Sequence, residues 1–283
     1  MFVCRRLQQK LKSGSEFKWQ SKRGVSVKKY TVIANWKMYL SFDSTITQVT
    51  DHFDALVTLA NNKNVSLFLA PTLPAIPELA IVFKETPVGW CAQDCSEHIA
   101  GAYTGQVSPE ALKAIGCNAC IIGHSERRKY CGETDEAIAH KLQALLDYNL
   151  SPVICIGEHE EGCDFEQAVA TLERQLKPIF DVLTAVQHKI NGLPVYFAYE
   201  PVWSIGTGKI ADELHLENIY VWLQQQIHKY APSVSGVLLY GGSVNANTIK
   251  FFKKFDRIQG FLVGKASLDF QEFEKILKCI MVE

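Results

Sequence analysis

Eight short apolar runs, separated by segments with helical spacing, constrain the fold of this 283-residue chain more than any other feature. Most of the runs lack an alternation of apolar and polar residues, which is typical of strands buried on both faces of a parallel sheet. The runs cover residues 30–34, 65–70, 88–92, 119–123, 152–156, 195–199, 237–240 and 260–263.

Helical patterns fill the intervals between these runs. In the segments 164–190, 214–230 and 270–281, apolar residues recur every three or four positions, as they do on the buried face of a helix. Residue types that favour helix N-caps precede several of the helical segments. We predict N-caps at Asp43, Thr134 and Asp269.

An alternation of eight strands and helices over about 250 residues predicts an α/β fold, a closed parallel (β/α)8 barrel. The alternative is an open, doubly wound sheet, which usually has a glycine-rich phosphate-binding turn after its first strand. Here the first run leads into Asn35, Trp36 and Lys37 instead. We therefore expect one barrel domain over residues 30–283.

Chemically active side chains follow several of the runs. Asn35 and Lys37 come after the first run, His124 comes after the fourth and Glu200 comes after the sixth. In a closed parallel barrel the carboxyl ends of all strands meet at one mouth, where catalytic groups lie. We expect these four side chains to share one site.

Glycine-rich turns follow the last two runs, at residues 241–243 and 264–267, and each leads into a helical segment. Backbone N–H groups in such turns bind phosphate. Taken singly, each feature has an ordinary explanation, such as a structural histidine, a solvated lysine or a simple turn. Their convergence on one face of the barrel favours proton transfer on a small phosphorylated substrate.

Five motifs, in order along the chain, resemble those of the triosephosphate isomerase family, and the resemblance runs from about Tyr30 to the C-terminus. The fold that it implies is the TIM barrel. The motifs are residues 34–38 (ANWKM), 121–128 (IIGHSERR), 198–208 (AYEPVWSIGTG), 240–244 (YGGSV) and 260–264 (GFLVG).

The resemblance implies interconversion of dihydroxyacetone phosphate and glyceraldehyde 3-phosphate, a step of glycolysis and gluconeogenesis, with no cofactor and no metal. It implies that Glu200 is the base, that neutral His124 polarises the carbonyl, and that Lys37 supplies positive charge. The substrate-binding residues that it implies are Asn35, Lys37, Gly206, Ser243, Gly264 and Lys265.

The resemblance also implies a lid and a homodimer. Residues 201–211 resemble the family's lid, which closes to exclude water. Glu126 and Arg127 would hold Lys37 and link the subunits. Residues 102–105 resemble the loop tip that reaches the neighbouring subunit's site.

Two positions depart from the family's pattern. Lys265 replaces the second glycine after the eighth strand, which is tolerable if its φ is negative and strained if its φ must be positive. Tyr39 stands where a small polar residue is commoner, and we attach no consequence to it.

Residues 1–29 form a basic N-terminal extension, with nine lysines and arginines and one acid. We expect it to be disordered and dispensable. The alternatives are an organelle transit peptide, an upstream mis-start and a basic tail that touches anionic partners. With a formal net charge of −1, the whole chain has no nucleic-acid or membrane-surface signature.

The nine cysteines are best explained as reduced thiols of a cytoplasmic enzyme. A redox role for Cys117 and Cys120, which match C-x-x-C, is disfavoured because Cys120 enters a strand. Loose spacing likewise disfavours a zinc site that would add Cys91 and Cys95.

Two other functions compete with the isomerase. One is a different reaction on a phosphate-binding barrel. The other is a catalytically silent barrel that acts as a binding partner. The first is disfavoured because Lys37, His124 and Glu200 all stand in the family's motifs. The second is disfavoured because silent relatives usually lose the base or the lid, and both are kept here.

Overall fold

The computed structural model of the chain describes residues 30–159, 161–190, 192–207 and 210–282. The predicted extension 1–29 lies outside the described residues. The eight predicted strands are present and form a closed barrel in sequence order, each paired in parallel with its neighbours. The strands are β1 (Tyr30–Asn35), β2 (Val65–Ala70), β3 (Gly89–Ala92), β4 (Ala119–Ile122), β5 (Ser151–Ile156), β6 (Pro194–Tyr199), β7 (Ser235–Tyr240) and β8 (Gly260–Val263).

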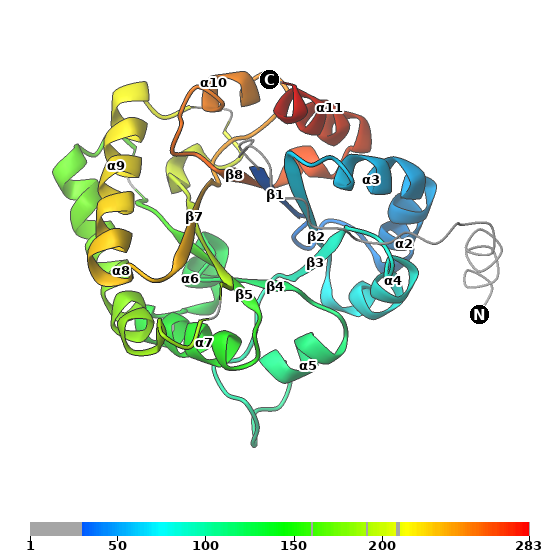
Figure 1. Cartoon of the computed structure of the whole chain (residues 1–283), viewed down its shortest axis with the longest axis horizontal. Helices are drawn as coiled ribbons and strands as arrows, with labels where there is room; N and C mark the ends of the chain where they lie inside the picture. The colour runs from blue at the N-terminus through cyan, green and yellow to red at the C-terminus, as the bar shows by residue number, and fades with distance from the viewer. Residues whose placement is uncertain (1–29, 160, 191, 208–209, 283) are drawn as a thin grey trace.

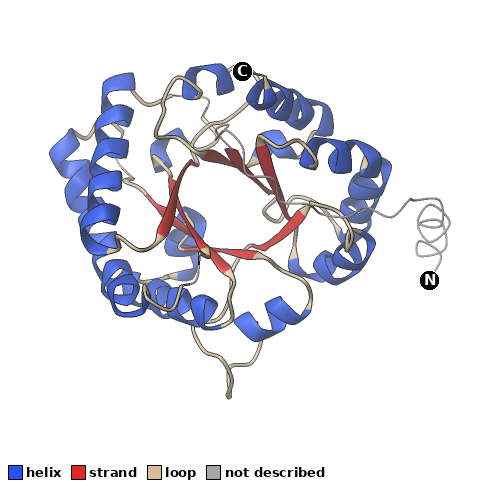
Figure 2. Cartoon of the chain, viewed as in Figure 1, coloured by secondary structure: helices blue, strands red, loops and turns tan. Residues whose placement is uncertain are grey.

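Helices surround the ring of strands on the outside (Figures 1 and 2). The α-helices are α2 (Phe42–Asp51), α3 (Phe53–Ala60), α4 (Ile76–Val82), α5 (Pro109–Ala114), α6 (Ser125–Cys131), α7 (Asp135–Asp147), α8 (Phe165–Val186), α9 (Glu213–Tyr230), α10 (Ile249–Phe252) and α11 (Phe270–Met281). Three 3₁₀ turns follow strands, namely η1 (Leu73–Ala75), η2 (Val202–Ser204) and η3 (Lys265–Ser267). The predicted closed (β/α)8 barrel is confirmed.

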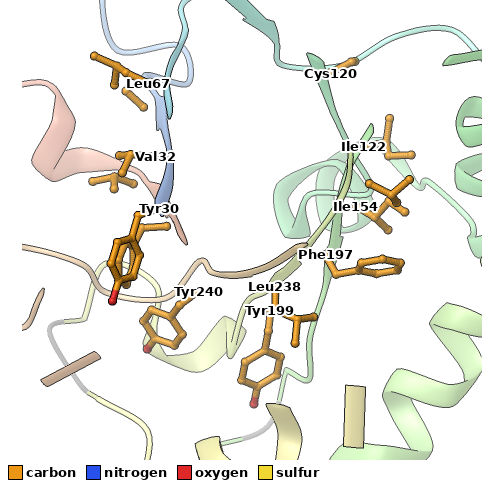
Figure 3. Close-up of a cluster of buried hydrophobic side chains, with 14 of the residues drawn as sticks. Tyr30, Val32, Leu67, Cys120, Ile122, Ile154, Phe197, Tyr199, Leu238 and Tyr240 are labelled. Atoms are coloured by element: carbon orange, nitrogen blue, oxygen red, sulfur yellow. The ribbon is translucent and has the colours of Figure 1, made fainter. Parts of the chain in front are cut away.

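Side chains of each strand alternate between two hydrophobic layers. The inner layer fills the barrel and includes Ile33, Ile121 and Leu239. The outer layer lies between the strands and the helices, and Figure 3 shows part of it. Because both faces of each strand are covered, the strands read as continuous apolar runs.

Helix caps agree with the sequence at two of three positions. The side chains of Thr134 and Asp269 accept backbone N–H groups at the starts of α7 and α11. The prediction for Asp43 is wrong, because the Ser41 hydroxyl accepts the Ser44 N–H at 3.1 Å and begins α2. Asp43 lies in the first turn, where its charge still complements the helix dipole.

Among the described residues, no helix combines the length and the apolar character that crossing a membrane requires. The cysteines of this part of the chain are free thiols. The described residues hold no cluster of three or more histidines, cysteines or acids that could bind a metal ion. A zinc site built from Cys91, Cys95, Cys117 and Cys120 therefore has no support.

The longest helix offers a test of the outer layer. Leu172 is fully buried on α8, while Glu173 beside it is exposed. We expect Leu172→Ala to lower the free energy of unfolding by about 2–5 kcal/mol, because it leaves a cavity in the core. Glu173→Ala should change it by less than about 0.5 kcal/mol. Urea denaturation at fixed protein concentration measures both, and equal effects would contradict this account of the layer.

Candidate active site

A cavity of about 530 Å³ opens at the carboxyl ends of the strands. It brings together every site residue predicted from the sequence. These are Asn35, Lys37, His124, Glu200, Gly206, Ser243, Gly264 and Lys265. The mouth of the barrel is therefore the candidate active site.

Glu200 follows β6 directly and continues the inward-facing series of that strand. Its side chain is almost fully buried, with 2% of the residue exposed, and its backbone N–H donates to the Ile156 carbonyl at 2.8 Å. One carboxylate oxygen, Oε2, accepts the Ser125 N–H at 3.4 Å. The other, Oε1, lies 3.4 Å from Nε2 of His124.

Glycines on the two neighbouring strands make room for Glu200. A Cβ atom on Gly157, after β5, would lie 1.7 Å from the Glu200 carbonyl oxygen. A Cβ atom on Gly241, after β7, would lie 2.8 Å from the Glu200 Cγ. Neither contact is sterically possible without movement, so both positions require glycine for the observed approach.

The thiol of Cys155 lies under Glu200 at the inner face of β5. Burial raises the pKa of Cys155 well above its usual value, and the nearby Glu200 carboxylate raises that pKa further. The thiol therefore stays protonated at neutral pH and is a poor nucleophile. Burial also raises the pKa of Cys117 to about 12, which removes support for a redox role of the C-x-x-C pair.

His124 is the N-cap residue of α6, and this position sets its tautomer. Its Nδ1 accepts the backbone N–H of Glu126 at 3.2 Å, so Nδ1 carries no proton. A ring with an unprotonated Nδ1 is neutral and holds its single N–H at Nε2. That N–H is on the side of the ring nearest Glu200 and is available to a ligand in the cavity.

Lys37 is held at the cavity wall by contacts at both ends of the residue. Its Nζ donates to Glu126 Oε1 at 2.7 Å, and its backbone N–H donates to Asn35 Oδ1 at 3.1 Å. Its φ is +50°, a left-handed conformation that is uncommon for a residue other than glycine. The Gln93 amide donates to the Lys37 carbonyl at 2.8 Å and stabilises this conformation.

The opposite side of the cavity is formed by turns after η2, β7 and β8. Gly206 has a φ of +72°, and the Ser243 hydroxyl donates to the Ser204 carbonyl at 2.5 Å. Of the described residues other than glycine, only Lys37 and Asn149 have a positive φ. Lys265 is therefore unstrained, and its N–H occupies the first position of η3.

Sequence reasoning missed two kinds of residue that shape the site. Gly157 directly follows a strand, as the predicted site residues do, and its place in the sequence could therefore have identified it as part of the site. Gln93 also follows a strand, after β3, but a lone amide carries no specific signal. The lid residues Gly208 and Lys209 lie outside the described residues.

The fold and the cavity define the class, an enzyme of the (β/α)8-barrel type whose chemistry lies at the carboxyl ends of the strands. Residues 30–280 match the family model described as triosephosphate isomerase. The chain is 33% identical to the triosephosphate isomerase of Aquifex aeolicus over 87% of this chain and 97% of that relative. It is 34% identical to that of Thermus thermophilus over 89% and 99%, and 36% identical to that of Trichlorobacter lovleyi over 87% and 97%.

The chain therefore belongs to the triosephosphate isomerase family, and its activity is the isomerisation for which the family is named. A neutral histidine at a helix N-terminus beside a glutamate base is the established arrangement of that family.

The glycine beside Glu200 gives a direct test of the site's geometry. We expect Gly157→Ala to lower kcat by about 10²-fold, because the added methyl group displaces the Glu200 backbone and a displacement of about 1 Å costs that much. Gly236→Ala is the matched control, since its Cβ would press only on the flexible Ile227 side chain, 2.9 Å away at the other end of the barrel. The control should lose some stability and keep its kcat. Steady-state kinetics and thermal unfolding on both variants decide, and an unchanged kcat in a folded Gly157→Ala enzyme would contradict the steric account.

Proposed function

We propose that Glu200 is the base that interconverts dihydroxyacetone phosphate and glyceraldehyde 3-phosphate through an enediolate. The observation that carries this proposal is the 3.4 Å approach of a buried carboxylate oxygen to His124 Nε2 in a cavity that also contains Lys37. No observation favours a silent barrel, since the base, the histidine and the lysine are all present.

Glu200 removes the proton from the substrate carbon next to the carbonyl and returns it to the neighbouring carbon. The electrons of the broken C–H bond form the enediolate, and negative charge develops on the carbonyl oxygen. His124 donates its Nε2–H to that oxygen and, as a neutral ring, moves the hydroxyl proton between the two oxygens. Substrate and product are isomers, so the reaction needs no redox cofactor.

Lys37 stabilises the developing negative charge, and its ion pair with Glu126 orients the ammonium group. Asn35 hydrogen-bonds the substrate. The phosphate is bound by backbone N–H groups of Gly206, Ser243, Gly264 and Lys265, which come from the turns that form one side of the cavity. Residues 201–211 act as a lid that excludes water.

The enzyme is a homodimer in this proposal. Large apolar side chains near the mouth are exposed in the single chain, notably Met38 at 89%, with Ile99 and Tyr103 also exposed. Arg127 forms ion pairs with Asp94 Oδ2 and with Glu133 Oε1, each at 2.8 Å. Asp94 lies in the segment between β3 and α5 that also carries Ile99 and Tyr103. An exposed apolar group of this kind is typical of a protein interface.

We assign the enzyme to the cytoplasm, and the free cysteines of the described chain agree with a reducing compartment. An organelle remains the alternative if residues 1–29 are a transit peptide. The mass of the intact native protein tests both assignments of that extension.

Shortening the base by one methylene tests its role. We expect Glu200→Asp to lower kcat by about 10²-fold or more, because the carboxylate no longer reaches the substrate carbon. Glu173→Asp, on the exposed face of α8, is the control and should leave kcat unchanged. A coupled assay for glyceraldehyde 3-phosphate gives both values.

Turnover in heavy water examines the same step from the substrate's side. Proton exchange on the Glu200 carboxylate should introduce deuterium on the product carbon. Product that is free of deuterium, from an enzyme that also tolerates Glu200→Asp, would exclude Glu200 as the base.

The phosphate side of the cavity is tested at Lys265. Because the backbone N–H is the binding group and φ is not positive, we expect Lys265→Gly to change KM by less than tenfold, or about 1.4 kcal/mol. A hundredfold rise in KM would show that the lysine side chain itself binds phosphate. Lys250→Gly, away from the cavity, controls for the loss of one positive charge.

A further inference from the structure

A buried carboxylate joins the two ends of the lid. Glu158 follows β5 and is 2% exposed. Its Oε1 accepts a hydrogen bond from the Trp203 indole N–H at 3.0 Å, and its backbone carbonyl accepts the Val202 N–H at 2.9 Å. Both donors belong to η2, at the beginning of the lid. Glu158 therefore holds that end of the lid through its side chain and its backbone.

The same carboxylate oxygen also contacts the far end of the lid, through a tyrosine. The Tyr199 hydroxyl lies 3.0 Å from Glu158 Oε1 and 3.1 Å from Nε2 of His215. His215 is in the first turn of α9, which begins directly after the lid (Figure 1). Trp203, at the beginning of the lid, thus contacts Glu158 directly, and His215, just after the end of the lid, contacts it through Tyr199.

The hydrogen count fixes the direction of this chain of contacts. The tyrosine hydroxyl carries one hydrogen, and in this arrangement Tyr199 donates it to Glu158. The hydroxyl oxygen then accepts from His215, so Nε2 of His215 carries a proton. The chain runs from His215 to Tyr199 to Glu158, and Trp203 donates to the same oxygen from the other side.

The ionisation of Glu158 depends on these donors. Burial raises the pKa of Glu158, while hydrogen bonds from its own backbone N–H, from Trp203 and from Tyr199, together with the charge of His215, lower it. Its second oxygen, Oε2, is buried and has no hydrogen-bond partner within the described chain. Positive charge close to this buried carboxylate therefore favours its ionised form, in addition to the hydrogen bonds.

Acidic and weakly acidic groups surround His215. The Asp212 carboxylate accepts the His215 backbone N–H at 3.2 Å, and Glu213 adjoins Asp212 at the start of α9. Glu161 and Cys163 line a cavity of about 490 Å³ with the histidine. Tyr220 of α9 packs against the Tyr199 ring. Among the described residues that line this cavity, His215 is the only basic one.

We propose that His215 is a positioning residue for the lid: through the Tyr199 hydroxyl it keeps Glu158 ionised, and the ionised carboxylate holds Trp203. Protonation of Glu158 weakens the acceptor for the indole N–H and loosens the hinge of the lid at η2. Loss of the histidine charge therefore makes that hinge release at a higher pH. The proposal depends on residues 201–211 acting as a lid, but its test does not use catalysis.

Trp203 provides the readout. The enzyme is labelled with 5-fluorotryptophan, and the Trp203 resonance is assigned by its absence from Trp203→Phe. We expect this ¹⁹F resonance of the ligand-free wild type to titrate with a midpoint above the usual pKa of a glutamate, and the midpoint is assigned to Glu158 by the loss of the titration in Glu158→Gln.

Two substitutions at His215 separate charge from hydrogen bonding. His215→Leu removes both, and we expect it to raise the midpoint by about one pH unit, a tenfold change in the acid constant. His215→Gln keeps a donor for Tyr199 without the charge and should raise the midpoint by a smaller amount. His228→Leu, on the same helix but outside the network, should leave the midpoint unchanged.

An unchanged midpoint in both folded His215 variants would overturn the proposal and leave His215 a structural residue only. If His215→Leu does not fold, His215→Gln alone decides by the same criterion. Failure of the base assignment at Glu200 would appear instead in the heavy-water experiment, so the two outcomes are distinguishable.

Discussion

The active site depends on a steric constraint at the carboxyl end of β6. Glu200 can reach its buried position only because the strands on both sides are followed directly by glycine, Gly157 after β5 and Gly241 after β7. The barrel closes tightly here, and the carboxylate is enclosed by backbone while it still borders the cavity. In the role of base that we propose for it, a carboxylate that is buried and fixed in place needs little reorganisation when the substrate binds.

Glu126 connects His124 and Lys37, the two side chains that we propose act together with Glu200. Its backbone N–H occupies Nδ1 of His124, and its carboxylate binds Nζ of Lys37. One residue in the first turn of α6 therefore sets the tautomer of the histidine and the orientation of the lysine. The resulting division of labour is physical: the neutral ring can donate to a developing oxyanion, while the ammonium group supplies the charge.

The sequence predicts most of the fold and of the candidate site, for identifiable reasons. Strands that are covered on both faces are recognisable in the sequence as apolar runs. Because a closed barrel brings the carboxyl ends of its strands together, the sequence alone predicts that Lys37, His124 and Glu200 share one site. The N-cap at Ser41 was missed because Asp43 and Ser41 are both good capping types, and only the backbone geometry decides between them.

Other features could not be predicted, because they depend on atoms brought together by the fold. The need for glycine at 157 comes from the carbonyl of Glu200, more than forty positions away in the sequence. The amide of Gln93 supports Lys37 through a contact between the segments that follow β3 and β1. Likewise, His215 looks like an ordinary helical histidine until the Tyr199 hydroxyl is seen beside its ring.

Side chains alternate between the two faces of a strand, and this explains why the Glu158–Tyr199 contact lies so close to Glu200 without sharing its cavity. Tyr199 and Glu200 are consecutive, so their side chains leave β6 on opposite faces. Tyr199 lies in the outer layer with the Glu158 network, and Glu200 faces the barrel mouth. Two backbone hydrogen bonds link the end of β6 to the end of β5: the Glu200 N–H donates to the Ile156 carbonyl, and the Val202 N–H donates to the Glu158 carbonyl. A shift of the end of β6 would therefore move Glu200 and the beginning of the lid together. In this barrel, the position of the proposed base and the contacts that hold the proposed lid therefore both depend on the carboxyl end of β6.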